Sequence, residues 1–282
     1  METIVTSLAK KVVISDKQPT VLIGERINPA GKKKLTESLK LGSLDVVRSE
    51  AASQTKAGSD ILDVCVGTFG ADEVTMLPKA VAAVMEITDL PLCIDSANLE
   101  ALKAALKVYK GKPLVNSVTG EEHSLATVLP LVKEYGTAVV GLVQDDEGIP
   151  KDAKKRIEIA HKIVKRAEDI GISRSDIVID CLTFAVGADT KAGPAILEAI
   201  CKIKEQLGVN MTLGASNVSF GLPDREALTS AFVVMTIAAG VTSLIVDTAK
   251  VRPIVLAADL VLAKDNRARR YIAAFRERQK PV

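Results

Sequence analysis

Short runs of Val, Ile and Leu alternate along the chain with longer stretches in which apolar residues recur every three or four positions. The short runs have the length and the β-branched content of strands, and the longer stretches have the spacing of amphipathic helices. In the stretch 99–109, for example, Ala101, Leu102 and Ala105 fall on one side and Lys103 falls on another. The pattern therefore predicts an α/β protein.

The same alternation predicts eight strand–helix units in series. We expect the strands at 21–27, 60–66, 91–95, 114–118, 138–143, 177–182, 211–216 and 243–247. We expect the helices near 45–57, 75–87, 99–109, 124–135, 152–170, 192–206, 225–239 and 251–264. Eight such units are typical of a closed (β/α)8 barrel, the TIM barrel. An open doubly wound sheet, which usually has fewer units, is the second alternative.

The chain is expected to form one domain, because no stretch rich in Pro, Gly or Ser divides it. Residues 1–20 form an N-terminal extension, in which Ile4–Ile14 adds a strand or a plug at the floor of the barrel. Residues 21–264 form the barrel itself. Residues 265–282 extend the last helix or form a surface tail.

The composition fits such a barrel. Hydrophobic residues make up 48% of the 282 residues and aromatic residues only 3%, with no Trp. A core of Val, Ile, Leu and Ala is typical of parallel strands covered on both faces. The net charge of +2 argues against a dedicated nucleic-acid binder. Asp265 and Glu277 interrupt the one basic cluster, which predicts the solvated face of a last helix; its members are Arg267, Arg269, Arg270, Arg276, Arg278 and Lys280.

The cysteines and histidines show no metal-ligand spacing. The four cysteines form no CxxC pair, and His123 and His161 are the only histidines. We therefore expect no bound zinc or other metal and free thiols, buried or half-buried, in a reducing cytoplasm. No apolar run reaches the roughly 18 residues of a membrane span, and the first residues lack a signal-peptide core. A soluble, cytoplasmic protein is predicted, with no membrane association.

Carboxylates and carboxamides close most of the expected strands. The active site of a barrel lies at the C-terminal ends of its strands, so these side chains are expected to meet there. Some of them are expected to serve as helix N-caps, as Asn98 and Asp224 are placed to do. The strand-end residues are Glu25, Arg26, Asn28, Asp63, Asp95, Ser96, Asn116, Ser117, Asp180, Ser216, Asn217, Ser219 and Asp247.

This set of side chains suits a flat, neutral ligand with many hydrogen-bonding edges. It contains no histidine, no nucleophile paired with a base, and no glycine-rich phosphate loop. An ionised Asp accepts two parallel hydrogen bonds from an amidine-like edge, and Asn supplies a donor and an acceptor together. The aminopyrimidinone edge of a pterin fits this description. Guanine offers much the same edge, so the residue types alone leave both ligands open.

At these residues the sequence resembles the methyltetrahydrofolate:corrinoid methyltransferases, a pterin-binding TIM-barrel family. The pterin domain of cobalamin-dependent methionine synthase is related to this family. The matching segments cover most of the expected barrel in the expected order, which makes them specific as a set. They are IGERIN (23–28), ILDVCVG (61–67), LCIDSAN (92–98), LVNS (114–117), GIPKD (148–152), IVIDCL (177–182) and GASNVSFG (214–221).

The resemblance implies roles for individual residues. Asp95, Asn116 and Asp180 correspond to residues that anchor the pterin, and Asn217 to the catalytic residue beside the ring nitrogen that bears the methyl group. The remaining pocket-lining positions implied by it are Glu25, Asp63, Gly214 and Ser216. Two positions depart from the family pattern: Cys65 stands where an Asn is common, and Phe220 where some relatives carry Gln.

The resemblance also implies the reaction. A methyl group moves between tetrahydrofolate and the cobalt of a corrinoid, in a direction that the sequence does not determine. The corrinoid is expected on a separate partner protein, because neither histidine lies in a D-x-H-x-x-G signature. In this family an Asn side chain stabilises the charge that develops on the nitrogen, without a conventional general acid.

Relatives of this family are dimers, so a homodimer is expected. Its contact is expected to include the apolar residues Val233, Val234, Ile237, Ile254, Val255 and Leu256. Two alternatives to the methyltransferase remain. Dihydropteroate synthase shares the fold and the pterin pocket, but it usually carries an Arg-x-His near the last strand, and 243–250 contains no His. A non-catalytic pterin-binding or corrinoid-docking subunit is the other.

Overall fold

A computed structural model describes residues 1–279, and its centre is a barrel of parallel strands. The eight-stranded sheet has the order β10-β3-β4-β5-β6-β7-β8-β9, so each strand lies beside its neighbour in the sequence. The strands are β3 (Val21–Ile27), β4 (Ile61–Cys65), β5 (Leu92–Asp95), β6 (Leu114–Thr119), β7 (Ala138–Leu142), β8 (Ile177–Asp180), β9 (Asn210–Thr212) and β10 (Ser243–Val246).

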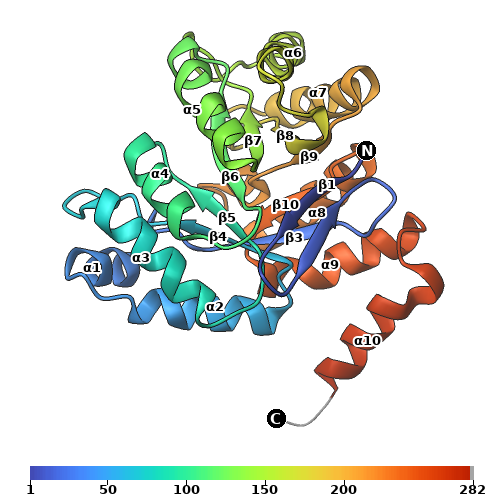
Figure 1. Cartoon of the computed structure of the whole chain (residues 1–282). Coiled ribbons are helices and arrows are strands. Elements are labelled where there is room, and N and C mark those ends of the chain that lie inside the picture. Colours follow the sequence, from blue (N-terminus) through green and yellow to red (C-terminus); the bar gives the residue numbers. More distant parts are fainter. Residues whose placement is uncertain (280–282) are drawn as a thin grey trace.

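The sheet closes between β9 and β10. The Ile245 amide donates to the Leu213 carbonyl at 2.8 Å, and the Thr242 amide donates to the Met211 carbonyl at 3.1 Å. With these bonds the last strand and the first strand of the sheet complete a ring (Figure 1). The predicted single-domain (β/α)8 barrel is therefore confirmed. The domain boundaries after residues 20 and 264 remain predictions.

Helices surround the barrel (Figure 1). Eight of them are the predicted ones, with ends within three residues of those expected. The ten helices are α1 (Lys33–Lys40), α2 (Asp45–Ala57), α3 (Glu73–Met85), α4 (Leu99–Val108), α5 (Glu122–Tyr135), α6 (Ala153–Asp169), α7 (Ala192–Leu207), α8 (Arg225–Ala239), α9 (Thr248–Val261) and α10 (Arg269–Arg278). The short helix α1 was not predicted, because it buries only Leu35 and Leu39.

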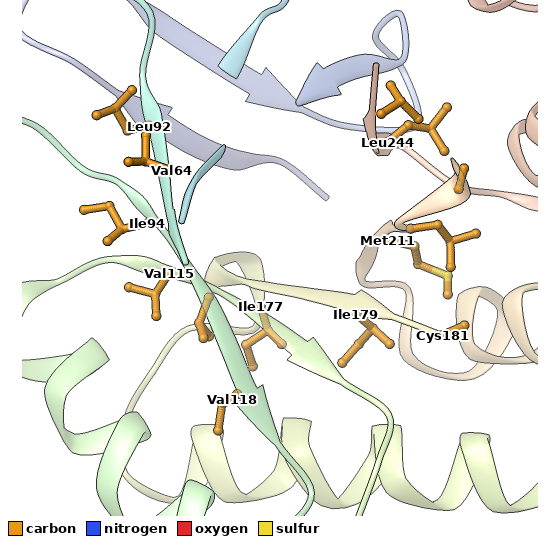
Figure 2. Packing of buried hydrophobic residues seen from close by; sticks show 14 of the residues in the cluster. Val64, Leu92, Ile94, Val115, Val118, Ile177, Ile179, Cys181, Met211 and Leu244 are labelled. Atoms are coloured by element: carbon orange, nitrogen blue, oxygen red, sulfur yellow. The ribbon is translucent and has the colours of Figure 1, made fainter. Parts of the chain in front are cut away.

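Alternate residues of each strand face opposite sides of the sheet, which creates two apolar layers. The outward residues pack beneath the helices. Figure 2 shows Val64, Leu92, Ile94 and Val115 of this layer, which come from the neighbouring strands β4, β5 and β6. The inward residues form a second, smaller cluster in which Ile23, Ile61, Cys93, Leu114, Ala138, Val140 and Val178 are buried.

An N-terminal hairpin closes the floor of the barrel, the end where the strands begin. Its strands β1 (Thr3–Thr6) and β2 (Lys11–Ile14) pair in antiparallel register. Val5 and Ile14 are completely buried within the inward cluster. Asn210, at the start of β9, donates through Nδ2 to the Ile14 carbonyl at 2.8 Å and to Thr3 Oγ1 at 3.0 Å. Residues 4–14 thus form the plug that the sequence suggested.

The chain turns sharply after α9. Ala263, Arg267 and Ala268 all have positive φ angles, so α10 is a separate helix and not a continuation of α9. In Figure 1, α10 leads away from the barrel. Arg276 and Arg278 on it are exposed, as expected for a solvated face. Lys280 lies outside the described residues.

Burial corrects two expectations about surfaces. Four of the six residues expected at a dimer contact are at most 3% exposed inside this chain, namely Val233, Ile237, Val255 and Leu256, so they are not available to a second copy. Cys201 is exposed, not buried, although all four cysteines are free thiols as predicted. Within residues 1–279, no helix is both long enough and apolar enough to cross a membrane.

Candidate functional site

Polar side chains replace apolar ones along the inward face as each strand approaches its C-terminal end, the mouth of the barrel. Because inward positions recur every second residue, the polar residue follows an apolar inward residue by two places. On β6, Leu114 is followed by Asn116, and on β8, Val178 is followed by Asp180. The same step leads from Ile23 to Glu25, from Ile61 to Asp63 and from Cys93 to Asp95.

Strand register brings three of these mouth residues side by side. Asp95 on β5 is paired with Asn116 on β6, and on its other side with Cys65 on β4. Asn116 Nδ2 also donates to Asp63 Oδ1 at 3.4 Å. Asp63, Asp95 and Asn116 therefore form one wall of the mouth, as the sequence predicted.

The carboxyl groups of this wall are held out of water. Burial raises the pKa of Asp95 to about 6; the Cys65 thiol, which donates to it, lowers that pKa, and the nearby charge of Glu73 raises it. Burial, followed by repulsion from Asp95, raises the pKa of Asp63 well above its usual range. Asp63 is 2% exposed. Among the described residues, no Lys or Arg is a main cause of either pKa shift, so a ligand edge with N–H donors would stabilise the ionised form of Asp95.

Asp180 forms a second wall on β8. It is 5% exposed, and its Oδ1 accepts a hydrogen bond of 2.7 Å from the Leu182 amide. Burial raises the pKa of Asp180 to about 6, while the amides of Leu182 and Gly214 and the charge of Arg156 lower it. A carboxylate with this pKa is mostly ionised at neutral pH and accepts hydrogen bonds.

Ser216 and Asn217 lie on a turn and not on a strand, which corrects the predicted strand 211–216. Strand β9 ends at Thr212, and Ala215–Ser219 form a 3₁₀ turn above it. Asn217 is exposed on this turn. A Cβ atom at Gly214 would lie 3.3 Å from Asn217 Nδ2, so the glycine leaves room for the amide.

Glu25 lies beneath this turn. Ser216 Oγ donates to Glu25 Oε1 at 2.9 Å, which joins β3 to the turn after β9 across the mouth. Burial raises the pKa of Glu25, while the hydrogen bond from Ser216 and the charge of Lys32 lower it. Glu25, Ser216 and Gly214 are therefore all placed at the mouth.

Two hollows open at this end of the barrel. One, of about 360 Å³, is bordered by Asp95 and Asn116 together with His123. The other, of about 210 Å³, is bordered by Glu25 and Ser216. All eight residues singled out in the sequence thus lie at one end of the barrel, on the walls around its mouth.

Comparison with known proteins is consistent with this geometry. A family model described as pterin binding enzyme matches residues 24–247. The chain belongs to the pterin-binding enzyme family. The matched segment begins just before Glu25 and runs to the end of the last barrel strand.

Two relatives in sequence are named for folate and corrinoid chemistry or methionine synthesis. Methylcorrinoid:tetrahydrofolate methyltransferase of Eubacterium limosum is 31% identical over 267 residues, which cover 91% of this chain and 96% of that protein. Methionine synthase of Mycobacterium leprae (strain TN) is 32% identical over 263 residues, which cover 89% of this chain. The chain spans only 22% of that longer protein.

Solved structures of dihydropteroate synthases share the fold. The enzyme of Vibrio fischeri ES114 has a TM-score of 0.71 at 17% identity, with 93% of this chain and 99% of that chain covered. The enzyme of Xanthomonas albilineans, solved with 7,8-dihydropteroate, has a TM-score of 0.69 at 20% identity, with 89% and 96% covered. At these identities the likeness concerns the fold alone.

The structure adds two residues to the surroundings of this pterin-binding family's site. Glu73, in the first turn of α3, accepts a hydrogen bond of 2.6 Å from Ser96 Oγ and faces Asp95. Arg156, on α6, faces Asp180. Both come from helices, whereas the residues predicted from the sequence all come from the ends of strands.

Two helix-capping expectations have different outcomes. Asn98 Oδ1 accepts hydrogen bonds from the Glu100 and Ala101 amides and caps α4, as predicted. Asp224 precedes α8 with a φ of 45° and makes no side-chain capping bond, so that expectation is wrong. Among residues 1–279, no three His, Cys, Asp or Glu side chains gather as a metal site would require. The expectation that no metal is bound remains a prediction.

Proposed function

We propose that this chain moves a methyl group between tetrahydrofolate and the cobalt of a separate corrinoid protein. The observation that carries the proposal is the set of buried and half-buried carboxylates and the half-buried Asn116 amide on the walls of the mouth, with Asn217 exposed on the turn above β9. The similarity to methylcorrinoid:tetrahydrofolate methyltransferase over 96% of that protein's length supports it.

In this proposal the two walls hold the pterin ring. Asp95, Asn116 and Asp180 bind the aminopyrimidinone edge, because carboxylates accept from its adjacent N–H and NH2 groups and the amide both donates and accepts. Such charge-assisted bonds are strong in a pocket that excludes water. Asp63, Glu25, Gly214 and Ser216 are proposed to surround the bound pterin from the walls of the mouth between the two hollows. The N–H donors of this edge would supply the hydrogen bonds that the carboxyl groups of the wall can accept.

Asn217 is proposed to act on the reacting nitrogen. A tertiary amine leaves poorly unless its nitrogen is protonated or strongly hydrogen-bonded as the bond to the methyl group breaks. The Asn217 amide, which lies next to Gly214 with room to turn, would strengthen its hydrogen bond to this nitrogen as charge develops. The corrinoid supplies the cobalt that accepts or donates the methyl group.

The remaining parts of the proposal concern the cell. The corrinoid protein is a separate partner that approaches the mouth, the methyltransferase is a cytoplasmic homodimer, and no metal, nucleic acid or membrane is needed. Either direction of methyl transfer is compatible with this pocket.

Dihydropteroate synthase is the alternative enzyme. It must hold a pyrophosphate and p-aminobenzoate beside the pterin. The last strand, β10, and the start of α9 contain no histidine in 243–250, where that enzyme usually has one. This favours methyl transfer over pteroate synthesis. A non-catalytic pterin-binding or corrinoid-docking subunit would have no need of Asn217.

The test is an anaerobic assay with methyltetrahydrofolate and cob(I)alamin, followed by the change of the corrinoid spectrum. Methyl transfer to cobalt that depends on the protein is expected, and the reverse transfer is measured with tetrahydrofolate and methylcob(III)alamin. A second assay supplies a pterin pyrophosphate and p-aminobenzoate, and no pteroate is expected. Pteroate formation without methyl transfer would contradict the proposal, and pterin binding without either activity would indicate a binding subunit.

A further inference from the structure

Helix α6 carries a buried arginine next to the strand end that presents Asp180. Arg156 is 1% exposed, whereas the other basic side chains of this helix are exposed or half-buried. Although Arg156 borders a hollow together with Lys151 and Asp189, almost none of its surface is in contact with solvent. Its hydrogen bonds and its charge therefore act inward, on the end of β8.

The hydrogen bonds that Arg156 makes within residues 1–279 all go to backbone carbonyls. Its Nη1 donates to the carbonyl of Cys181 and, at 2.9 Å, to the carbonyl of Leu182. It forms no salt bridge with any acidic side chain of residues 1–279, and its Nε has no partner there. Burying a charged group away from water typically costs several kcal/mol. Because Arg156 is buried without an ion-pair partner, this cost must be offset by the groups that its guanidinium stabilises.

The two carbonyls belong to a turn with an unusual backbone. Leu182 has a φ of 57°, in the left-handed region, which costs a non-glycine residue roughly 1–2 kcal/mol. Such a conformation persists where the surroundings hold it from several sides. Arg156 holds the carbonyl side of this turn, and Asp180 Oδ1 accepts the Leu182 amide at 2.7 Å on the other side.

We propose that Arg156 is a positioning residue for Asp180, which fixes the orientation of that carboxylate and keeps it charged for binding the pterin. This role rests on the proposed function only in naming the ligand. The action of Arg156 on Asp180 can be measured without one.

The charges around Asp180 agree with this role. Its register partners, Leu142 on β7 and Thr212 on β9, are neutral. Burial raises the pKa of Asp180 to about 6, the amides of Leu182 and Gly214 lower it, and the charge of Arg156 lowers it further. The groups that face Arg156 in turn are Asp152, Lys151, Asp189 and the Cys181 thiol. Removal of the guanidinium is therefore expected to raise the pKa of Asp180 further.

The experiment is a carboxyl ¹³C NMR titration of protein labelled at Asp, with the Asp180 signal assigned by its loss in Asp180→Asn. Arg156→Gln keeps one donor but removes the charge, and the pKa of Asp180 is expected to rise by about one pH unit. Arg156→Lys keeps the charge but cannot hold both carbonyls, so a smaller rise is expected. Arg166→Met, which removes an arginine on the same helix that pairs with Glu122, should leave Asp180 unchanged.

Tetrahydrofolate binding between pH 5.5 and 9, measured by calorimetry, gives the second readout. For Arg156→Gln, affinity is expected to fall about two-fold at pH 7 and about eight-fold at pH 5.5, and to match the wild type at pH 9, because the ionised fraction of Asp180 follows a pKa shifted by about one pH unit. In the Asp180→Asn background, Arg156→Gln should no longer move the pH profile, which separates Asp180 from Asp95.

Two results would overturn the inference. The first is an Asp180 titration in Arg156→Gln that matches the wild type. The second applies if Arg156→Gln does not fold. In that case the inference is overturned if Arg156→Lys matches the wild type in both the Asp180 titration and folate affinity. If the wild type binds no folate but Arg156→Gln still raises the pKa of Asp180, the result contradicts the proposed function and not the action of Arg156.

Discussion

Inside the barrel, the inward side chains at the floor are apolar and those at the mouth are polar, although both ends belong to the same strands. At the floor, the hairpin residues Val5 and Ile14 pack against Leu114 and Val178 in a cluster that excludes water. At the mouth, Asp180 is nearly as well buried, but it is a charged side chain and belongs to no hydrophobic cluster. On one strand, a buried apolar residue of the core and a polar residue of the mouth are thus only two positions apart.

The comparison shows where stability and function are located. Burying a large aliphatic side chain stabilises a protein by about 1.5–3 kcal/mol, so the floor holds the barrel together. Burying a carboxyl group disfavours its charged form, and Asp95 and Asp180 both have raised pKa values of about 6 for this reason. The mouth thus costs stability, which is common where a site is prepared for a ligand.

The largest effect is expected at the floor. Leu114→Ala removes a completely buried side chain and should lower the free energy of unfolding by about 2–5 kcal/mol. Denaturant unfolding measures this loss. Folate affinity of the folded fraction should stay within about three-fold of the wild type, because the mouth is formed by other residues.

Asn116→Ala is the matched variant, two residues further along β6. It should weaken folate binding while changing stability much less than Leu114→Ala does. Equal losses of stability in the two variants, with equal effects on affinity, would show that floor and mouth are not separate in this way.

The next effect concerns rate. Asn217→Ala is expected to lower the rate of methyl transfer by about 10²–10³-fold, the usual result of losing one preorganised donor. Pterin affinity should change far less, because the contact strengthens only as charge develops. Single-turnover kinetics with a corrinoid, beside equilibrium binding, measures both. Equal losses in rate and affinity would mean that Asn217 only binds, and near-normal turnover would mean that it only supports its turn.

Smaller losses are expected for the anchoring carboxylates. Asp95→Ala and Asp180→Ala should each weaken tetrahydrofolate binding by about 1.5–3 kcal/mol, the scale of a hydrogen bond to a charged group. In the wild type, affinity should fall as the pH drops through about 6, where both groups become protonated. Titration calorimetry over this range tests both statements. Unchanged affinity in folded variants would exclude these residues as pterin anchors.

Much of the barrel could be predicted from the sequence because its physical causes are local. Alternating runs and amphipathic stretches gave all eight strands and the eight helices that cover them, since both patterns reflect burial on one side. Asp95, Asn116 and Asp180 were found for the same reason, because each continues the inward face of its strand. The roles of these residues came only from the resemblance, since Asp and Asn also suit guanine.

Other features depended on tertiary contacts. Strand β9 ends at Thr212, and the positive φ of Asp224 prevents it from capping α8 in the usual way; neither follows from residue type. Arg156 had a visible signal. It falls on the same stripe of α6 as the buried Ile159, Ala160 and Ile163, where a charged residue is out of place. Which strand end it faces could be seen only in the fold.

The smallest effect concerns the free energy of unfolding of Asp180→Asn, which measures how much the buried carboxylate at the mouth destabilises the protein. The pKa of Asp180 rises from an ordinary 3.8 to about 6 on folding, so the folded state prefers the protonated carboxyl. The stability that this group contributes is present below about pH 3.8 and is lost as the pH rises through about 6. Above that pH the folded protein carries the full cost of a buried charge. An amide carries no such charge, and its oxygen can still accept the Leu182 amide.

Asp180→Asn is therefore expected to unfold at higher denaturant concentration than the wild type at pH 7.5, by about 1–2 kcal/mol, while binding tetrahydrofolate more weakly. The gain should shrink as the pH falls toward 4, because the wild-type carboxyl then becomes neutral too. Asp72→Asn, the same exchange at an exposed cap of α3 whose pKa is lowered by Thr75, should give no gain at any pH. If Asp180→Asn were less stable than the wild type at pH 7.5, the Asp180 carboxylate would be stabilised by its surroundings more than burial disfavours it. The contrast between a stabilising floor and a costly mouth would then not hold at β8.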